Sequence, residues 1–369
     1  MEATEITVLV LVDFSNAFNM VDHDILLAIL SHLSVSDDVL AWFSSYLQGR
    51  QQSVHVDESS SNWNHLEAGV PQGGILSPLL FSIFINLITS ELQCAYYLYA
   101  DDLQVYCRAK VGQLPEAIAR VNADLAAIHN WSAKYGIAVN PNKCQAIVVG
   151  GSRTLSRVDV AAIPPVLFNG AIIPFSSDVK NLGLNVDSNL TWRVHVTSVC
   201  QRVTGTLRFL YRLRNFLPSS AKIMLVQSLV FPIFDYADDL NADLLNKLDR
   251  LLNNCIRFVF NLRKYDHVSA FRLQLKWLPI RQRREQRALT TLFSLLNSPN
   301  SPTYLSSYFQ YINANHSKYL RSTNNLLLQC PTHRTDFLHS SFFIQSILLW
   351  NALPTDVRTA TSRLSFKFK

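Results

Sequence analysis

Residues 95–107 read AYYLYADDLQVYC: two short apolar runs, Ala95–Ala100 and Leu103–Cys107, separated by Asp101 and Asp102. Two runs of this kind with a two-residue gap predict a β-hairpin. Asp-Asp is a poor choice for such a turn, because tight hairpin turns favour Asn-Gly or Gly-Gly and adjacent like charges repel. A departure from local preference at a hairpin tip indicates a functional reason for the two carboxylates.

A third carboxylate stands at the end of another predicted strand. Ile6–Val12 is an unbroken apolar, β-branched run that stops at Asp13, which predicts a buried strand with Asp13 at its C-terminal end. Together with Asp101 and Asp102, Asp13 would make a hard-oxygen site suited to Mg²⁺. Two such ions about 4 Å apart could activate a 3′-hydroxyl and stabilise a leaving pyrophosphate. Alternatively, each Asp is a solvated turn or cap residue.

The tetrapeptide Tyr-Ala-Asp-Asp occurs twice, at 99–102 and at 236–239, and the second copy serves as an internal control. It follows Phe231-Pro-Ile-Phe-Asp, which predicts a helix cap and not a hairpin tip. The flanking apolar runs therefore distinguish the first copy as the candidate site.

The rest of the chain mixes helices with hairpins up to about residue 150 and is mostly helical beyond 190. In the first part the predicted elements are helices at 22–33, 36–47, 79–88 and 115–135, a hairpin at 51–65 and a strand at 146–149. Further helices are predicted near 195–214, 219–230, 243–261 and 280–297. This pattern favours an α+β fold over a doubly wound parallel sheet.

Composition and charge limit the class of protein. The 369 residues are 49% hydrophobic and 16% charged, which excludes a disordered chain and predicts two or three domains. Residues 1–150 carry six Lys and Arg against fifteen Asp and Glu, and the remainder carries 27 against 12. This asymmetry predicts an acidic working centre joined to a basic region that faces a polyanion, with a solvated basic surface as the alternative.

Other classes of site are excluded. The six cysteines are scattered without a Cys-x-x-Cys pair, so we expect neither a zinc site nor a disulfide framework. The same pattern predicts that the protein is in a reducing compartment. The longest apolar runs, 79–88 and 223–234, are too short or too interrupted to span a bilayer. We therefore expect no membrane association and an intracellular location in the cytoplasm and nucleus.

Several blocks of the sequence resemble, in order, the reverse transcriptases of non-LTR (LINE-type, Jockey-like) retrotransposons. The palm-like blocks are VDFSNAFN at 12–19 with VDH at 21–23, GVPQGGILSPLLF at 69–81, YADD at 99–102, and Trp131 and Gly136 with NPNK at 140–143. The primer grip is resembled by Leu182-Gly183, and the thumb by residues 210–213 and 234–237. The segment LWNALP at 349–354 resembles a common ending of these elements. The resemblance covers nearly the whole chain.

The resemblance implies an α+β polymerase palm, an antiparallel sheet with helices, followed by a mostly helical thumb and C-terminal region. The implied domains are a palm at 1–150, a primer-grip and thumb-like region at 151–270, and a basic C-terminal region of retroelement type at 271–369. The implied activity is RNA-directed DNA polymerisation by two-metal nucleotidyl transfer with Mg²⁺. The partners would be an RNA template, a DNA primer and deoxynucleoside triphosphates.

The resemblance also implies roles for individual residues. The catalytic set would be Asp13, Asp101, Asp102 and Lys143, with the Phe14 carbonyl joining the three carboxylates as a metal ligand. Lys143 would protonate pyrophosphate or steady its loop. Gln72 and Gly73 would contact the incoming nucleotide, on a loop whose glycines allow close approach. Phe18 would lie under the sugar and exclude a 2′-hydroxyl, or else pack in the core.

Arginines on the predicted helices are candidates for nucleic-acid contact. Arg202, Arg208 and Arg212 fall opposite the apolar stripe of the 195–214 helix. Arg281 and Arg284 follow Pro279 at a helix start, where the helix dipole disfavours positive charge. Such arginines could line a phosphate backbone without sequence preference, and a solvated helix face is the alternative.

The sequence also departs from the family pattern. Asn19 stands where the family commonly has Asp, and Leu87 where it often has Asp. Asp13 lies so close to the first residue that the fingers and the upstream endonuclease domain have no counterpart, which predicts an incomplete copy of an element. The alternatives are a catalytically inactive nucleic-acid-binding relic and an unrelated metal-dependent nuclease, against which the 69–78 loop and the thumb-like region argue.

Overall fold

The strand β1 (Glu5–Val12) lies inside the main sheet, and its alternate residues Ile6, Val8, Val10 and Val12 are buried. The computed structural model describes residues 5–159, 163–236, 242–312 and 326–368. In this structure the chain divides into two compact units. Unit 2 comprises residues 3–183 with 187–190, and unit 1 comprises 191–369 with the short segments 1–2 and 184–186. Each unit is described separately.

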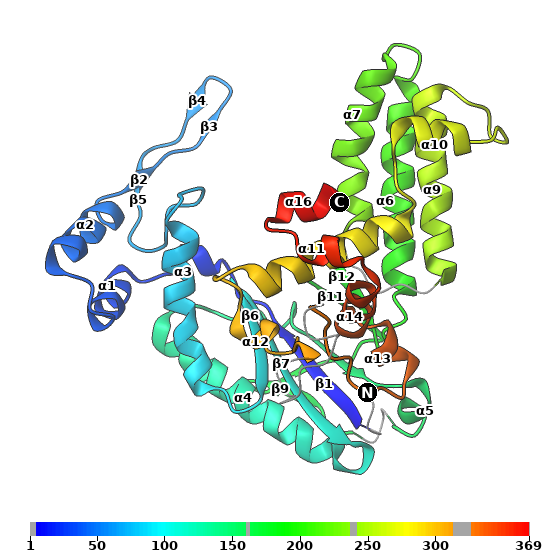
Figure 1. Ribbon diagram of the computed structural model, residues 1–369. Helices are drawn as coiled ribbons and strands as arrows, with labels where there is room; N and C mark the ends of the chain where they lie inside the picture. Colours follow the sequence, from blue (N-terminus) through cyan, green and yellow to red (C-terminus); the bar gives the residue numbers. More distant parts are fainter. Residues whose placement is uncertain (1–4, 160–162, 237–241, 313–325, 369) are drawn as a thin grey trace. The chain divides into compact units, whose positions relative to one another are not determined.

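The main sheet of unit 2 has the order β6-β7-β1-β8, and every neighbouring pair is antiparallel. Its other strands are β6 (Ala95–Tyr99), β7 (Asp102–Lys110) and β8 (Gln145–Val149). The helix α4 (Leu114–Tyr135) packs on this sheet through a fully buried row of Ile118, Val121, Leu125 and Ile128 (Figure 1). The predicted α+β fold, with an antiparallel sheet and covering helices, is therefore confirmed.

The remaining elements of unit 2 surround this sheet. They are α1 (His23–His32), α2 (Asp37–Leu47), α3 (Ser77–Ile85), α5 (Ser152–Leu155), and the short strands β2 (Gln51–Gln52), β3 (His55–Val56), β4 (Ser59–Ser60), β5 (Asn64–His65), β9 (Val166–Phe168), β10 (Ala171–Ile173) and β11 (Asp178–Asn181). β2 pairs with β5 and β3 with β4, which makes the predicted 51–65 hairpin an extended arm (Figure 1). β11 pairs with β12 (Leu184–Asp187) in a separate two-stranded sheet.

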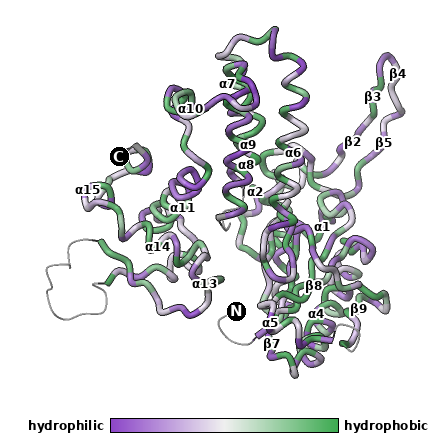
Figure 2. The backbone as a smooth tube through the Cα atoms, turned by 90° about the vertical axis from the view of Figure 1, so that its right-hand side faces the viewer, coloured by the Kyte–Doolittle hydropathy of each residue, from purple (hydrophilic) through white to green (hydrophobic). Residues whose placement is uncertain are grey.

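Unit 1 is helical in its described part. Its helices are α6 (Arg193–Arg212), α7 (Ser219–Leu229), α8 (Phe231–Phe234), α9 (Ala242–Phe260), α10 (Ser269–Leu275), α11 (Ile280–Asn297), α12 (Thr303–Ser306), α13 (Asp336–Ser340), α14 (Phe342–Ala352), α15 (Thr355–Arg358) and α16 (Arg363–Phe368). Along α6 and α9, buried hydrophobic residues recur about every three or four positions among hydrophilic ones, as in amphipathic helices (Figure 2). One apolar cluster joins α6, α7, α8 and α9, and a second joins α11, α14 and α16.

The four long helices predicted beyond residue 190 are confirmed as α6, α7, α9 and α11. The second Tyr-Ala-Asp-Asp copy lies mostly outside the described residues, which resume at 242 after Tyr236. Within the described part of the chain, no helix is long and apolar enough to cross a membrane.

Asp124, in the middle of α4, ties the start of β6 to this helix. The residue is 2% exposed, and its carboxylate accepts the backbone N–H groups of Gln93 at 3.1 Å and Cys94 at 2.8 Å. Burial, and then the charge of Asp124, raise the pKa of the Cys94 thiol to about 12. A buried carboxylate therefore anchors the strand that leads to Asp101.

We predict that Asp124→Ala lowers the free energy of unfolding by about 2–4 kcal/mol, because two buried amides lose a charged acceptor. Urea unfolding would measure the loss, and hydrogen exchange would show faster exchange at the Cys94 amide. Glu116→Ala removes an exposed carboxylate from the same helix and should cost less than about 1 kcal/mol. Equal losses in the two variants would contradict the anchoring role.

Candidate active site

The backbone of Asp13, directly after β1, is held on both sides by the turn that follows α4. Its N–H donates to Cys144 Sγ at 3.4 Å, and its carbonyl accepts from the Asn140 N–H at 2.8 Å. Cys144 is buried, and its thiol donates in turn to the Asn140 carbonyl at 3.3 Å. The predicted NPNK block thus supports Asp13 through the Asn140 backbone, and Cys144, which follows the block, adds the thiol contact.

The side chain of Asp13 has one oxygen without a hydrogen-bond partner. The side chain as a whole is 41% exposed, yet Oδ2 is buried and accepts no hydrogen bond from the described residues. Lys143 Nζ lies 3.8 Å from this oxygen, on a side chain that is 67% exposed. An exposed ion pair of this length contributes little to stability, so Lys143 leaves the desolvated oxygen largely uncompensated.

The hairpin turn differs from the prediction by one residue. Tyr99 pairs with Asp102, so the two turn residues are Ala100 and Asp101, and Asp102 begins β7. Ala100 takes a φ of 51°, a left-handed conformation that is uncommon for a residue other than glycine. This register also sets Leu98 opposite the buried Leu103, which joins two apolar side chains across the hairpin.

The pairing of β1 with β7 brings the carboxylates together. Val12 is the partner of Leu103, so Asp13 and Asp102 each lie one residue beyond the same antiparallel pair. Partial burial raises the pKa of the Asp102 carboxyl, and the charges of Asp101 and Asp13 raise this pKa further. The charges of Asp13 and Asp101 therefore reach Asp102, although 88 residues separate Asp13 from Asp101 in the sequence.

The donor atoms suit a hard divalent cation in their chemistry. Carboxylate oxygens prefer Mg²⁺, and a buried oxygen without a donor, close to other negative charges, is stabilised by a cation. In the described part of the chain, however, no group of three His, Cys, Asp or Glu side chains converges closely enough to hold a metal ion. The three residues therefore fit a cation by chemistry without forming a closed ligand set.

The Phe14 carbonyl is oriented away from its neighbouring segment. The hydrogen bonds Ser15 N–H to Ala138 O and Asn140 N–H to Asp13 O flank the Phe14–Val139 bridge. This arrangement is the non-hydrogen-bonded type of antiparallel pair, in which the residue's own N–H and C=O point away from the partner. The carbonyl is therefore not used by Val139, while the Phe14 ring is buried against Trp131.

Gln72 is attached to the segment that follows Asp13. Its Nε2 donates to Asn19 Oδ1 at 2.9 Å, and the Val70 N–H donates to the Phe18 carbonyl at 2.9 Å. The Phe18 ring stacks on the buried Phe81 with centroids 4.1 Å apart, so core packing accounts for one of its faces. The contact between Gln72 and Asn19 was not predicted, because nothing in the sequence pairs two residues 53 positions apart.

Gly73 takes a φ of 80° beside Gln72, a backbone conformation that favours glycine, and a Cβ added there would meet no atom within 4 Å. The space beside this backbone is open, and contact of Gly73 with a nucleotide stays a prediction.

Most of the predicted arginines lie at the surface of unit 1. Arg202, Arg208 and Arg212 are exposed on α6, opposite the buried Val199, Val203 and Leu207, and Arg281 is exposed on α11. Arg284 differs from the prediction: it is 7% exposed and donates to the Phe234 carbonyl at 3.1 Å. Its guanidinium is committed to the core of the unit, and we correct its assignment as a nucleic-acid contact.

Gly69 packs so closely against the backbone of Asn19 that a side chain would not fit there. Its φ is 92°, and a Cβ at this position would lie 2.8–3.0 Å from the backbone atoms of Asn19. We therefore predict that Gly69→Ala lowers the free energy of unfolding by about 2 kcal/mol or more. Chemical denaturation would test this, with Gly112→Ala as the control, since a Cβ there meets nothing within 4 Å. A loss as small as that of the control would refute the packing argument.

The raised pKa of Asp102 predicts a dependence of stability on pH. Between the ordinary Asp pKa and the raised one, the folded chain binds more protons than the unfolded chain, so the free energy of unfolding falls as pH rises through this window. Asp101→Asn removes one of the repelling charges. We expect this variant to be more stable than the wild type at pH 7, with a difference that shrinks below about pH 4.

Urea unfolding from about pH 3 to pH 7 measures this difference, and an NMR titration of Asp102 should show its pKa moving down in the variant. Asp57→Asn makes the same charge change on an exposed residue and should show neither effect. A pH-independent loss of stability in Asp101→Asn would be inconsistent with carboxylate repulsion.

Comparison with known proteins identifies the family of the chain. Residues 1–186 match the family model described as reverse transcriptase (RNA-dependent DNA polymerase). The RNA-directed DNA polymerase from mobile element jockey of Drosophila funebris is 30% identical over 237 residues, which cover 61% of this chain and 25% of the relative. The probable RNA-directed DNA polymerase from transposon BS of Drosophila melanogaster is 30% identical over 246 residues, which cover 62% and 25%.

Among solved structures, telomerase from Candida albicans with a fragment of telomeric RNA matches with a TM-score of 0.36 and 13% identity, over 82% of this chain and 49% of that chain. The chain spans about a quarter of the length of the curated relatives that it matches. The family match over half of the chain and the jockey and BS relatives lead to one conclusion: the chain belongs to the reverse transcriptase family and is of the Jockey-like, non-LTR retrotransposon type.

Proposed function

We propose that this chain carries out RNA-directed DNA synthesis, with Asp13, Asp101 and Asp102 as the catalytic carboxylates. The observation that supports this most directly is the buried Oδ2 of Asp13 beside Asp102, which accepts no hydrogen bond from the described residues, in a chain of the reverse transcriptase family. In the reaction, the 3′-hydroxyl of a DNA primer gives up its proton to solvent as its oxygen forms a bond to the α-phosphorus of a deoxynucleoside triphosphate. The bond from that phosphorus to pyrophosphate breaks, and the RNA template selects the base.

The carboxylates would act through Mg²⁺. Asp13 and Asp101, with the Phe14 carbonyl, would hold the cation, and Asp102 would add negative charge beside them. A bound divalent cation supplies stabilisation of the charge that develops on phosphate oxygens. The pKa of Asp102, raised first by partial burial and then by the charges of Asp101 and Asp13, supports this role, because a cation would stabilise carboxylates that are partly desolvated and repel one another.

The remaining residues would bind and orient the substrates. Gln72, held by Asn19, and Gly73 would contact the nucleotide, and Phe18, held by Phe81, would lie against its sugar. Lys143 would place its positive charge near the leaving pyrophosphate. Arg202, Arg208, Arg212 and Arg281 would contact the phosphate backbones of template and primer.

The domain assignment follows the same proposal: a palm at 1–150, a primer-grip and thumb-like region at 151–270 and a basic C-terminal region at 271–369. All six cysteines are free, which suits a reducing compartment, and we assign the protein to the cytoplasm and nucleus.

Primer extension tests the proposal. The chain should extend a labelled DNA primer on an RNA template in the presence of Mg²⁺ and deoxynucleoside triphosphates. Asp13→Asn should reduce the rate by about 100-fold or more, because several kcal/mol of charge stabilisation are lost. The control Asp57→Asn makes the same charge change at an exposed site and should keep the wild-type rate.

Equal extension by the wild type and Asp13→Asn would refute the catalytic assignment. Salt-sensitive binding of the template without any extension by the folded wild type would identify a nucleic-acid-binding relic and would also overturn the proposal.

A further inference from the structure

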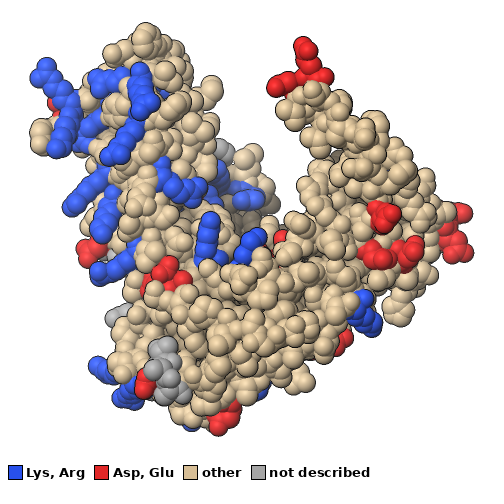
Figure 3. All heavy atoms as spheres, turned by 180° about the vertical axis from the view of Figure 1, so that it is seen from behind, with Lys and Arg blue, Asp and Glu red and all other residues tan. Residues whose placement is uncertain are grey.

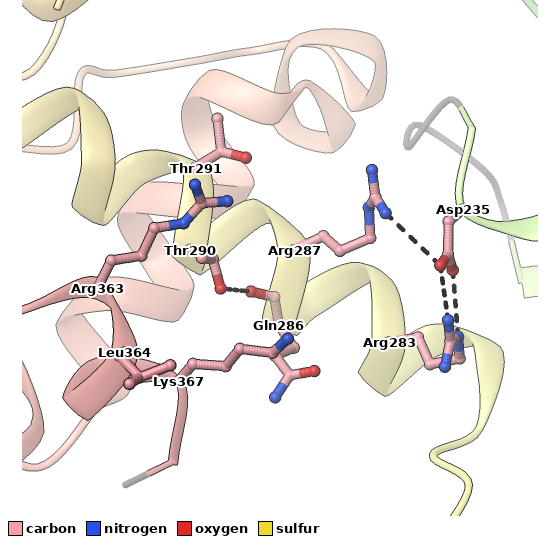
Figure 4. A pocket seen from close by; sticks show the side chains of 9 residues that line it. All are labelled: Asp235, Arg283, Gln286, Arg287, Thr290, Thr291, Arg363, Leu364 and Lys367. Carbon is pink, nitrogen blue, oxygen red and sulfur yellow. Dashed lines mark hydrogen bonds and ion pairs between the residues drawn. The ribbon is translucent and has the colours of Figure 1, made fainter. Parts of the chain in front are cut away.

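A basic cavity lies wholly within unit 1, and its lining contains none of the catalytic, metal-binding, nucleotide-binding or nucleic-acid-binding residues named above. Its volume is about 590 Å³, and it is bounded by α11, by α16 and by Asp235, which follows α8 (Figure 4). Ligand pockets are commonly of roughly 300–1,000 Å³, so the cavity is larger than a single ion requires. Its lining is polar or charged apart from Leu364. A cavity of this kind suits a charged ligand better than an apolar one.

Its charges are unbalanced. Four cations, Arg283, Arg287, Arg363 and Lys367, face a single carboxylate, that of Asp235. Asp235 is occupied by Arg283, whose Nε and Nη2 donate to it at 3.1 Å and 2.6 Å. Arg283 also lies over the Phe231 ring at 4.1 Å, so its position is fixed by packing as well as by charge. This pair is effectively neutral and forms one wall of the cavity.

Three cations remain for a ligand. Arg287 lies 3.5 Å from the same carboxylate, but its side chain is 53% exposed. Arg363 and Lys367 extend from α16 toward α11 (Figure 4), are exposed, and form no ion pair with any described residue. The cavity therefore carries a net charge of +3 on side chains from two separate helices.

The arrangement favours phosphate groups in series over a single anion. Arginine matches phosphate with paired donors, and lysine contributes a point charge. Cations on two separate helices can each contact a different phosphate group along an extended ligand. One small anion could not contact all of them at once. Lys and Arg side chains also gather widely over the helices of unit 1, which favours a polyanion (Figure 3).

We propose that this cavity binds the phosphodiester backbone of a single nucleic-acid strand, without reading its bases. The proposal extends the proposed function, since a reverse transcriptase holds both template and primer, and it assigns strand binding to Arg287, Arg363 and Lys367. Arg283 and Asp235 are positioning residues that fix the wall from which Arg287 extends. Because binding requires no catalysis, it can be measured without metal or nucleotide.

The test is fluorescence anisotropy with a labelled single-stranded RNA, at several salt concentrations and without Mg²⁺ or nucleotides. The triple variant R287Q/R363Q/K367Q should bind at least about 10-fold more weakly, and its slope of log affinity against log salt should fall by about 2, because each phosphate contact contributes roughly 0.7 for a single strand. The control R193Q/K247Q/K264Q removes the same charge from exposed positions of unit 1 outside the cavity. It should change both quantities much less.

Two further arms identify the ligand. A fluorescent nucleoside triphosphate should bind the wild type and the cavity variant alike, and a poly-glutamate peptide of equal charge should bind more weakly than the RNA. Equal effects of the two triple variants would show that only general charge matters and would overturn the proposal. Loss of triphosphate binding or of peptide binding in the cavity variant, with RNA binding unchanged, would assign the cavity to a free nucleotide or to an acidic protein and would also overturn it.

The two proposals fail separately. A chain that extends primers normally but binds RNA independently of the cavity residues refutes only the strand-binding cavity. A chain without polymerase activity whose RNA binding depends on Arg287, Arg363 and Lys367 refutes only the catalytic proposal.

Discussion

The antiparallel register between β1 and β7 is the constraint on which the candidate active site depends. Because Val12 is the partner of Leu103, Asp13 emerges beside Asp102 at the end of the ladder. Like charges opposite one another on neighbouring strands are destabilising. Partial burial raises the pKa of Asp102 most, and the charges of Asp101 and Asp13 raise this pKa further. The apolar rows of β1 and β7, with α4 packed on the sheet, hold the repelling groups in place. Core packing thus maintains an arrangement that the carboxylates alone would not adopt.

Much of this arrangement could be predicted from local sequence patterns. The apolar run of β1, the periodicity of α4 and the hairpin of β6 and β7 are each encoded within fewer than about 25 residues. The exact turn was not predictable in this way, because both Ala100-Asp101 and Asp101-Asp102 leave two apolar runs on either side. Pairing across the hairpin decides between them, since only the first sets Leu98 opposite Leu103. The contacts of Asp13 with Cys144 and of Gln72 with Asn19 depend on chain segments that meet only in the folded unit.

The wrong assignment of Arg284 has a different origin. Arg284 is four residues from both Ile280 and Ala288, and these three residues form one buried row on α11. The periodicity of the sequence therefore already placed Arg284 on the core side of the helix, while its charge suggested the surface. In the structure the Phe234 carbonyl accepts a hydrogen bond from the guanidinium, which lowers the cost of burying that charge. When one residue of a buried helical row is charged, the sequence alone therefore does not show whether its side chain is buried or exposed. That depends on whether the folded chain supplies a hydrogen-bond partner for the charge.

Asn19 illustrates how a departure from the family pattern can preserve a contact. The residue holds Gln72 through a carbonyl oxygen, which an Asp at this position would replace with a carboxylate oxygen. The carboxylate would make a stronger, charge-assisted hydrogen bond, but it would add a negative charge to a segment in which residues 1–107 contain one Lys or Arg, Arg50. After partial burial, the charges of Asp101 and Asp13 already raise the pKa of Asp102 in that segment. An amide at position 19 therefore keeps the hydrogen bond that orients Gln72 while avoiding further electrostatic repulsion in the unit that carries the carboxylates.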